Sequence, residues 1–248
     1  VMSPLNYWDN NVNGTLNLLK IMKKYNCKNI VFSSSATVYK AKLNELLFEN
    51  DICEPVNPYG NTKLTIERLL KDIYNSDPSQ WRIASLRYFN PVGAHESGLI
   101  GEGALGKPNN IYPQITKVAI GKIKEIKIFG SDWPTVDGTG IRDYIHIMDL
   151  AEGHIAALDY LLKEEPQILT LNLGTGNGTS VLELIRCFEK VNNVKIPFSF
   201  DNRRKGCNAF VLADNSSAKK ILNWIPKRNL DDICRDGWNW QLKNPNGY

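Results

Sequence analysis

The sequence lacks the long apolar runs of a membrane protein. No hydrophobic stretch approaches the roughly 18 residues that a membrane span needs, although 42% of the 248 residues are hydrophobic. Charge of one sign is also scarce, because 30 basic residues against 26 acidic ones leave a net charge of +4. This excess does not indicate a nucleic-acid partner. With 18 glycines and 12 prolines, the chain is not collagen-like or of low complexity. It is typical of a globular protein with one large or two modest domains.

Cysteine is sparse, and its spacing excludes the common metal and redox motifs. There are five cysteines and no CxxC pair: Cys27, Cys53, Cys187, Cys207 and Cys234. An odd number cannot pair completely within one chain, so reduced thiols in a cytoplasmic protein are the simplest interpretation. The three histidines also lack metal-ligand spacing, and we expect structural roles and no metal for them: His95, His146 and His154.

Hydrophobic periodicity predicts alternating helices and strands. Helical spacing covers about residues 9–25 and 58–74, and short apolar runs at 28–33 and 82–88 are typical of buried strands. This alternation favours right-handed crossovers and a parallel, doubly wound α/β sheet. Residues 90–142 are rich in loops, which is typical of a binding region. Further strands are predicted at 126–129, 143–148 and 168–173, and further helices at 113–122, 149–162 (with Asp149 as N-cap), 181–191, 216–224 and 231–242.

Tyr59 and Lys63 lie four residues apart at the start of a predicted helix. This spacing puts both side chains on one helical face. An ammonium group there favours the phenolate and lowers the tyrosine pKa from about 10, so that the tyrosine can act as a general base toward an alcohol. The alternative is an aromatic residue near a helix cap beside a surface lysine. The spacing alone leaves both interpretations open.

A cluster of hydroxyl side chains follows the predicted strand at 28–33. Ser33, Ser34, Ser35 and Thr37 come at the point where that strand ends. Ligands of parallel α/β sheets bind beyond the carboxyl ends of the strands, so these hydroxyls could orient a substrate hydroxyl and bond to Tyr59. A polar exit from a strand is the plain alternative. The combination of this cluster with the Tyr–Lys spacing is more specific than either part.

Together these motifs resemble the Ser/Thr–Tyr–Lys triad of the extended short-chain dehydrogenase/reductases. The wider sequence, from residue 4 to 248, resembles the UDP-glucose 4-epimerase family within that group. The resemblance rests on Asp9-Asn10-Asn11-Val12-Asn13-Gly14-Thr15, Phe32-Ser33-Ser34-Ser35-Ala36-Thr37-Val38-Tyr39, Asn57-Pro58-Tyr59-Gly60, Arg87-Tyr88-Phe89-Asn90-Pro91-Val92-Gly93-Ala94-His95, Asp137-Gly138-Thr139-Gly140 and Arg142-Asp143-Tyr144-Ile145-His146.

The resemblance implies an NAD-dependent epimerase that interconverts UDP-glucose and UDP-galactose through a transient 4-keto sugar. Tyr59 is then the base at the 4-hydroxyl, Ser35 and Thr37 bind the 4-oxygen, and Lys63 holds the nicotinamide ribose and lowers the Tyr59 pKa. Residues implied to bind NAD are Asn10, Ser33, Tyr59, Lys63 and Tyr88. Residues implied to bind the UDP-sugar are Ser35, Asn90, Asn110, Ile111, Phe129, Arg142, Arg204 and Val211, whose two guanidinium groups suit a pyrophosphate.

Other functions within and outside this chemistry remain open. A nucleotide-sugar 4,6-dehydratase is disfavoured, because Ala36, Thr37 and Val38 stand where such enzymes carry an Asp-Glu pair. Another 4-epimerase, acting on a UDP-N-acetylhexosamine or a uronate, is the enzymatic alternative. The small side chain of Val211, which aligns with the family's gate beside the sugar C2 group, predicts room for an N-acetyl group. The alternative from another class is a non-catalytic nucleotide-sugar-binding remnant.

The chain departs from the family pattern in two places. The glycine-rich phosphate loop and the acidic residue that binds the adenosine ribose belong to N-terminal βα units that the sequence does not contain. We therefore expect a fragment of a longer polypeptide, inactive alone; the alternative is that another chain supplies the missing units. The segment 173–179 does not supply the missing loop. It has Thr179 where a G-x-G-x-x-G loop needs its third glycine, and is interpreted as a strand-to-helix turn.

The second departure is Cys207, which replaces the aspartate with which the family contacts the uridine ribose.

The resemblance also implies a domain division and an assembly. We expect a Rossmann-like sheet domain, N-terminally incomplete, formed by residues 1–91 and about 143–175. A smaller α/β domain for the UDP-sugar is expected from 92–142 and about 176–248. A homodimer is expected through the helices at 9–25 and 58–75.

Overall fold

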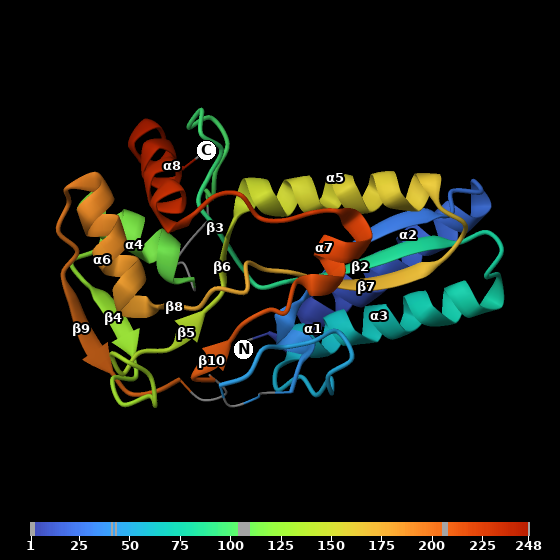
Figure 1. Ribbon diagram of the computed structural model, residues 1–248, viewed down its shortest axis with the longest axis horizontal. Coiled ribbons are helices and arrows are strands. Elements are labelled where there is room, and N and C mark those ends of the chain that lie inside the picture. Colours follow the sequence, from blue (N-terminus) through green and yellow to red (C-terminus); the bar gives the residue numbers. More distant parts are fainter. Residues whose placement is uncertain (1–2, 41, 43, 104–109, 205–207, 248) are drawn as a thin grey trace.

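The structure is a computed structural model that describes residues 3–40, 42, 44–103, 110–204 and 208–247. Its main sheet has three parallel strands in the order β1-β2-β7: β1 (Asn29–Ser35), β2 (Arg82–Tyr88) and β7 (Ile168–Leu173). Helix α3 (Pro58–Ser76) connects β1 to β2, and α5 (Ile147–Lys163) precedes β7. Figure 1 shows α3 and α5 on opposite sides of this sheet. The predicted α/β fold with parallel strands is confirmed.

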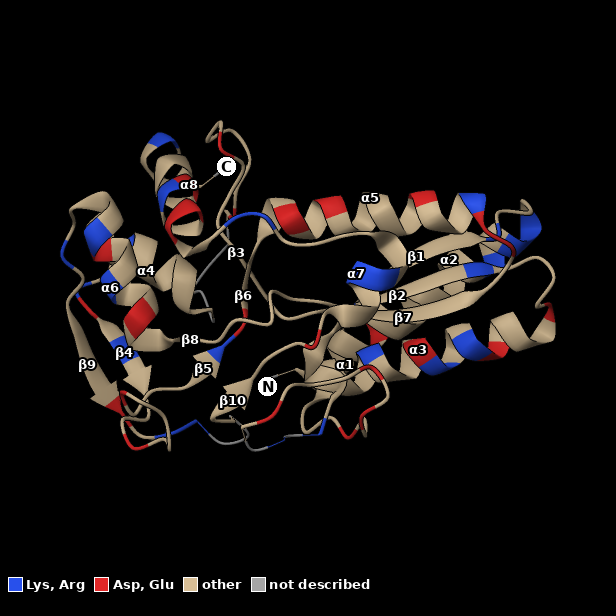
Figure 2. Ribbon diagram, in the orientation of Figure 1, with Lys and Arg blue, Asp and Glu red and all other residues tan. Residues whose placement is uncertain are grey.

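Alternating side chains of β2 explain why helices cover both faces of the sheet. Ile83 packs with Leu19, Met22, Ile66 and Leu70 of α2 (Gly14–Lys24) and α3. Ala84 and Leu86 face the other way and pack with residues of α5, β7 and α7 (Ser216–Leu222). Both faces of a parallel sheet are buried in this way, which accounts for the near-continuous apolar run in the sequence. In Figure 2 the strands of this sheet are largely tan, whereas α3 carries both blue and red segments.

A second group of elements lies at the other end of the molecule (Figure 1). β3 (Asn90–Val92) pairs with β6 (Tyr144–His146), and β4 (Ile126–Phe129) pairs with β9 (Phe198–Asp201), both parallel. β5 (Ile141–Arg142) lies between β10 (Phe210–Val211) and β8 (Thr179–Ser180). Helices α4 (Ile111–Ala119), α6 (Val181–Asn192) and α8 (Leu230–Lys243) enclose a separate core around Phe188.

The helix expected at 9–25 begins earlier and changes its hydrogen-bond pattern. It consists of α1 (Pro4–Tyr7), the π-helical segment η1 (Trp8–Asn13) and α2. Within η1, Asn11 donates from its amide nitrogen to the Thr62 hydroxyl of α3 at 2.9 Å. Side-chain periodicity does not reveal such a π-helical insertion, which occurs frequently at functional sites.

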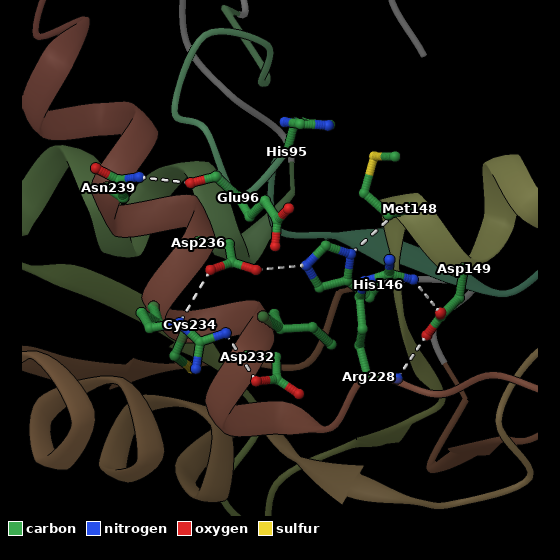
Figure 3. A network of polar contacts seen from close by, with 12 residues as sticks. His95, Glu96, His146, Met148, Asp149, Arg228, Asp232, Cys234, Asp236 and Asn239 are labelled. Carbon is green, nitrogen blue, oxygen red and sulfur yellow. Dashed lines mark hydrogen bonds and ion pairs between the residues drawn. The ribbon is translucent and has the colours of Figure 1, made fainter.

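The expected N-cap of α5 at Asp149 is wrong. The helix begins at Ile147, and the Nδ1 atom of His146 accepts a hydrogen bond from the Met148 amide at 3.0 Å. Figure 3 shows His146 between Met148 and Asp236, whose carboxylate is 3.3 Å from His146 Nε2. Asp149 instead lies buried in the first turn and bonds to the Arg228 guanidinium at 2.5 Å. Among the residues that the structure describes, no helix combines the length and apolarity of a membrane span.

Candidate active site

Ser35 and Thr37 are held together where β1 ends. The Ser35 hydroxyl oxygen accepts hydrogen bonds from the Thr37 amide at 3.3 Å and the Thr37 hydroxyl at 3.0 Å. It thereby caps the short 3-10 helix η2 (Ala36–Val38). A strand followed by a capped turn fixes both hydroxyls at the carboxyl edge of the sheet, which is where parallel sheets bind ligands.

The start of α3 brings Tyr59 to this edge. Asn57 caps the helix by accepting a hydrogen bond from the Gly60 amide at 2.9 Å, and Pro58 occupies the first turn. Gly60 is buried, and a Cβ atom there would lie only 2.6 Å from the Thr37 carbonyl oxygen. Glycine therefore allows the first turn of α3 to pack against η2, one residue from Tyr59.

The structure brings Ser35, Tyr59 and Lys63 together. The Ser35 hydroxyl is close enough to the Tyr59 phenol to lower its pKa. The Lys63 ammonium lies 5.5 Å from the centre of the Tyr59 ring and donates to the Ser33 carbonyl oxygen at 2.9 Å. Tyr7 of α1 packs edge-on against the Tyr59 ring, with ring centroids 5.9 Å apart. This arrangement has the parts of an acid–base site for an alcohol.

The expected lowering of the Tyr59 pKa is wrong for this structure. Burial raises the pKa of Tyr59 above its usual value, and the hydrogen bond with Ser35 offsets this only in part. Burial also lowers the pKa of Lys63. The ammonium is directed at the Ser33 carbonyl, so the penalty for burying a phenolate outweighs its attraction to the lysine.

Two further residues implied to bind NAD lie beside this group. The Tyr88 hydroxyl donates to the Ser33 hydroxyl oxygen at 2.7 Å and also contacts Nε2 of His154. Burial raises the pKa of Tyr88 to about 12. Asn10 lies in η1 and donates to the Asn11 side chain at 3.3 Å. Ser33 therefore connects Lys63 to Tyr88, whereas Asn10 lies on a separate element.

A pocket of about 230 Å³ brings together most of the residues implied to bind the UDP-sugar. Those lining it are Asn90, Asn110, Ile111, Phe129, Arg142 and Arg204. The Arg204 guanidinium stacks on the Phe129 ring at 3.7 Å, and Arg142 donates to the Ile141 carbonyl at 2.7 Å. Two guanidinium groups in one pocket suit a diphosphate. Arg203, by contrast, stacks on Trp133 and pairs with Asp132 at 2.7 Å.

Two other residues assigned to the sugar, Ser35 and Val211, lie outside the lining of this pocket. Val211 is the β10 partner of Arg142 and packs against the cluster that contains Ala36, Val38 and Tyr39. It therefore lies between the pocket and the Ser35 end of the sheet. Cys207 falls outside the described residues.

Four polar or aromatic residues of the pocket were not predicted: Gln114, Lys127, Trp133 and Tyr144. Two of them had a detectable signal in the sequence. Lys127 shares a strand face with Phe129, since side chains alternate along β4. Gln114 lies one helical turn from Asn110 and Ile111. Trp133 lies in a loop, and no spacing points to it.

The segment 173–179 is a strand-to-helix turn, as predicted. The buried Asp143 carboxylate accepts hydrogen bonds from the Thr175 amide and hydroxyl, both at 2.7 Å, and from the Gly176 amide at 2.9 Å. Burial raises the pKa of Asp143 in spite of these bonds. Because the amides are engaged inside the protein, this turn does not present them to a phosphate.

Comparison with known proteins places the chain among epimerases. Residues 1–174 match the model of the NAD dependent epimerase/dehydratase family. UDP-glucose 4-epimerase 2 of Arabidopsis thaliana is 51% identical over 100% of this chain and 71% of its own length. UDP-glucose 4-epimerase of Bacillus subtilis is 49% identical over 100% of this chain and 73% of its own length.

Solved structures agree in fold over nearly the whole chain. UDP-glucose 4-epimerase of Stenotrophomonas maltophila, with bound NAD and formylated UDP-arabinopyranose, has a TM-score of 0.95 at 46% identity, covering 98% of this chain and 71% of that one. The Bifidobacterium longum enzyme, in complex with NAD+ and UDP, has a TM-score of 0.93 at 49% identity, covering 99% and 72%. The family match and these identities over the full chain show that it belongs to the NAD dependent epimerase/dehydratase family.

Proposed function

We propose that this chain carries the catalytic residues and the UDP pocket of a UDP-glucose 4-epimerase. The enzyme inverts carbon 4 of the hexose and interconverts UDP-glucose and UDP-galactose through a 4-keto sugar. The observation that carries the proposal is the placement of Ser35, Tyr59 and Lys63 side by side at the carboxyl end of β1. It occurs in a chain about half identical to UDP-glucose 4-epimerases.

Tyr59 moves the proton of the reaction. Its phenolate accepts the proton of the sugar 4-hydroxyl as the 4-keto sugar forms, and the phenol returns a proton when the hydroxyl is restored with the opposite configuration. Ser35, bonded to Thr37 at 3.0 Å, holds the 4-oxygen against the tyrosine. The Lys63 ammonium, which donates to the Ser33 carbonyl at 2.9 Å, holds the end of β1 beside Tyr59.

The donor groups around Ser33 fit the nicotinamide end of NAD. The Lys63 ammonium and the Ser33 and Tyr88 hydroxyls converge at the carboxyl ends of β1 and β2, and can hold a ribose and an amide. Asn10 contributes from η1. Held there, NAD would supply reversible hydride transfer at carbon 4 of the hexose.

The pocket holds the nucleotide. Arg142 and Arg204 bind the diphosphate as paired charge-assisted donors, and Phe129 and Ile111 provide apolar surface for the base. Asn90 and Asn110 supply amide groups for the sugar hydroxyls. Val211 lies between this pocket and Ser35, and so beside the hexose whose carbon 4 is inverted.

A UDP-N-acetylhexosamine is the second candidate substrate, because Val211 is small and only partly buried. A UDP-Glc/GlcNAc 4-epimerase from Campylobacter jejuni is 34% identical to this chain, with a TM-score of 0.81. The full-length enzyme should epimerise UDP-N-acetylgalactosamine as well as UDP-galactose. Turnover of UDP-galactose alone would contradict this second assignment.

The direct test is the conversion of UDP-galactose by the full-length protein supplied with NAD. Proton NMR of the product follows the hydrogen at carbon 4, and the expected result is a mixture of UDP-galactose and UDP-glucose. The Tyr59→Phe variant should bind UDP normally and leave UDP-galactose unchanged. Absence of conversion by the unmodified full-length protein would overturn the proposal.

The assembly, domain division and location belong to the same proposal. Residues 1–91 with about 143–175 form the sheet domain, and 92–142 with about 176–248 form the UDP-sugar domain. A homodimer through α2 and α3 is supported by an exposed apolar stripe formed by Leu18 and Ile21 of α2 and by its C-cap, Tyr25. Ile21→Glu should convert the full-length dimer to a monomer in size-exclusion chromatography. Free cysteines such as Cys53 and Cys187 suit the reducing cytoplasm.

A further inference from the structure

Three successive serines at the end of β1 each contact a different turn of α3. Tyr59, Lys63 and Glu67 follow one another at four-residue intervals, and so share one face of the helix. Tyr59 bonds to the Ser35 hydroxyl and Lys63 to the Ser33 carbonyl. Glu67 accepts a hydrogen bond from the Ser34 hydroxyl at 2.5 Å. The first two contacts belong to the catalytic group, and the third has no role in the reaction described above.

Glu67 is held by a buried arginine on the neighbouring strand. Arg87 donates from Nε to Glu67 Oε1 at 3.0 Å and from Nη2 to Oε2 at 2.6 Å. Both side chains are buried, with exposed fractions of 6% for Arg87 and 9% for Glu67. Ser34 is 1% exposed and is the register partner of Arg87 across β1 and β2. Ser34, Glu67 and Arg87 therefore form one buried triad that spans two strands and α3.

Arg87 is itself fixed from other directions. Its Nη1 atom donates to the Glu49 carbonyl at 3.0 Å, and its guanidinium stacks on the Tyr39 ring at 4.7 Å. Burial alone would lower the pKa of Arg87, but hydrogen bonding with Glu67 keeps that pKa above its usual value. The guanidinium is thus a fixed charged anchor, and a carboxylate at position 67 is needed to pair with it.

The triad lies directly behind the catalytic hydroxyls. Ser34 is flanked in the chain by Ser33, which accepts from Lys63 and Tyr88, and by Ser35, which bonds to Tyr59. A shift of the Ser34 peptide relative to α3 therefore displaces both neighbours at once. A displacement of about 1 Å near reacting groups can cost roughly 100-fold in rate.

We propose that Glu67 is a positioning residue of the active site. Through Ser34 it sets the end of β1 against α3, and so keeps the Ser35 hydroxyl within hydrogen-bonding distance of the Tyr59 phenol. The kinetic part of this inference rests on the proposed function. The geometric part concerns the Ser35–Tyr59 contact alone and can be measured without turnover.

Two variants of the full-length protein test the proposal. Glu67→Gln keeps the shape of the side chain and removes its charge. The double variant Glu67→Leu with Arg87→Met replaces the pair by apolar groups, an exchange that buried ion pairs often tolerate without loss of stability. Asp236→Asn is the matched control, because Asp236 is a buried carboxylate bonded to His146 in the other region of the molecule.

The expected kinetic result is a loss confined to kcat. Both Glu67 variants should lower kcat by about 10- to 100-fold, while KM for UDP-galactose stays within about 3-fold because the UDP pocket is not touched. Asp236→Asn should change neither value beyond that range. A loss of the same size in the control, or an equal rise in KM, would reduce Glu67 to a structural role.

The activity-independent readout is the titration of Tyr59, followed by NMR of ring-labelled tyrosine. The groups facing the phenol are Ser35 of β1, Lys63 of α3, Tyr7 of α1 and Tyr88 of β2. The Glu67 variants leave all four side chains present. Because Ser35 lowers the Tyr59 pKa, a weaker contact with Ser35 should raise that pKa. An unchanged titration in both variants would overturn the proposal. If the unmodified protein lacks epimerase activity, the proposed function fails while this titration still decides the inference.

Discussion

The Ser35–Tyr59–Lys63 group and the UDP pocket are assembled in different ways. The first comes from two adjacent elements, β1 and α3, whose side chains contact one another directly. The pocket draws its lining from β3, α4, β4, β5, β6, the start of α6 and the segments that carry Trp133 and Arg204. The chemical step thus depends on the contact between β1 and α3, whereas nucleotide binding depends on many segments. A substitution in one region should therefore leave the function of the other largely unchanged.

The two regions also differ in their electrostatics. Burial raises the pKa of Tyr59 and lowers that of Lys63. The chemical step therefore depends on groups whose protonation state changes with pH. The pocket relies on guanidinium groups, which stay charged over the whole working range of pH. We therefore expect kcat to vary with pH more than KM does.

Tyr59→Phe should give the largest effect and the sharpest separation of the two regions. Loss of the proton acceptor should lower kcat by about 100- to 10,000-fold, while the affinity for UDP, measured by calorimetry, stays within about 2-fold because the phenol does not line the pocket. Substantial turnover by this variant would contradict the assignment of Tyr59 as the general base.

Arg204→Ala should give the opposite pattern. Loss of a charge-assisted contact to the diphosphate is worth about 1.5–3 kcal/mol, so KM should rise roughly 10- to 150-fold. In steady-state kinetics kcat should change little. Lys190→Ala, at the end of α6 and outside the pocket lining, is the control and should leave both values unchanged. A fall in kcat alone would contradict the assignment of Arg204 to binding.

Ser35→Ala should lower kcat by a smaller factor, about 10- to 100-fold, and move its pH dependence. The Ser35 hydrogen bond lowers the pKa of Tyr59. Removing it raises that pKa, so less phenolate exists at neutral pH and kcat should rise to its plateau at a more alkaline pH. A pH–rate profile of wild type and variant checks this, and a shift toward acid would contradict it.

Val211→Tyr should change the preference between substrates, and it tests the boundary between the two regions. A bulky ring beside the hexose should reduce turnover of UDP-N-acetylgalactosamine by about 10- to 100-fold relative to UDP-galactose. Competition between the two substrates measures this ratio directly. An unchanged ratio would place Val211 away from the sugar.

Local chemistry made much of the sheet region predictable from the sequence. The strands at 82–88, 126–129 and 168–173 have the predicted bounds, because each is a short apolar run between turn residues. The Tyr59–Lys63 spacing, combined with the hydroxyl cluster after β1, predicted that Tyr59 lies beside the serines of that strand. The π-helical segment η1 and the cap at His146 were not predictable, since both depend on contacts with distant residues such as Thr62 and Asp236.

The pKa shift of Tyr59 could not be predicted from the sequence for the same reason, because it depends on contacts between distant elements. Spacing suggested that Lys63 lowers the Tyr59 pKa, but burial between α1, β1 and α3 raises it. The pocket residues were named only through the family resemblance. Lys127 and Gln114 lie on the same strand or helix face as predicted pocket residues, so this pattern could have added both to the predicted lining.

The most direct test of the division between the two regions is a double-mutant cycle on the full-length protein. Ser35→Ala and Arg204→Ala are combined, and kcat/KM for UDP-galactose is measured for wild type, both single variants and the double variant. If the two regions act independently, the two losses should add in free energy to within about 0.5 kcal/mol. A coupling energy well above that value would contradict the account, because catalysis and nucleotide binding would then share a single set of contacts.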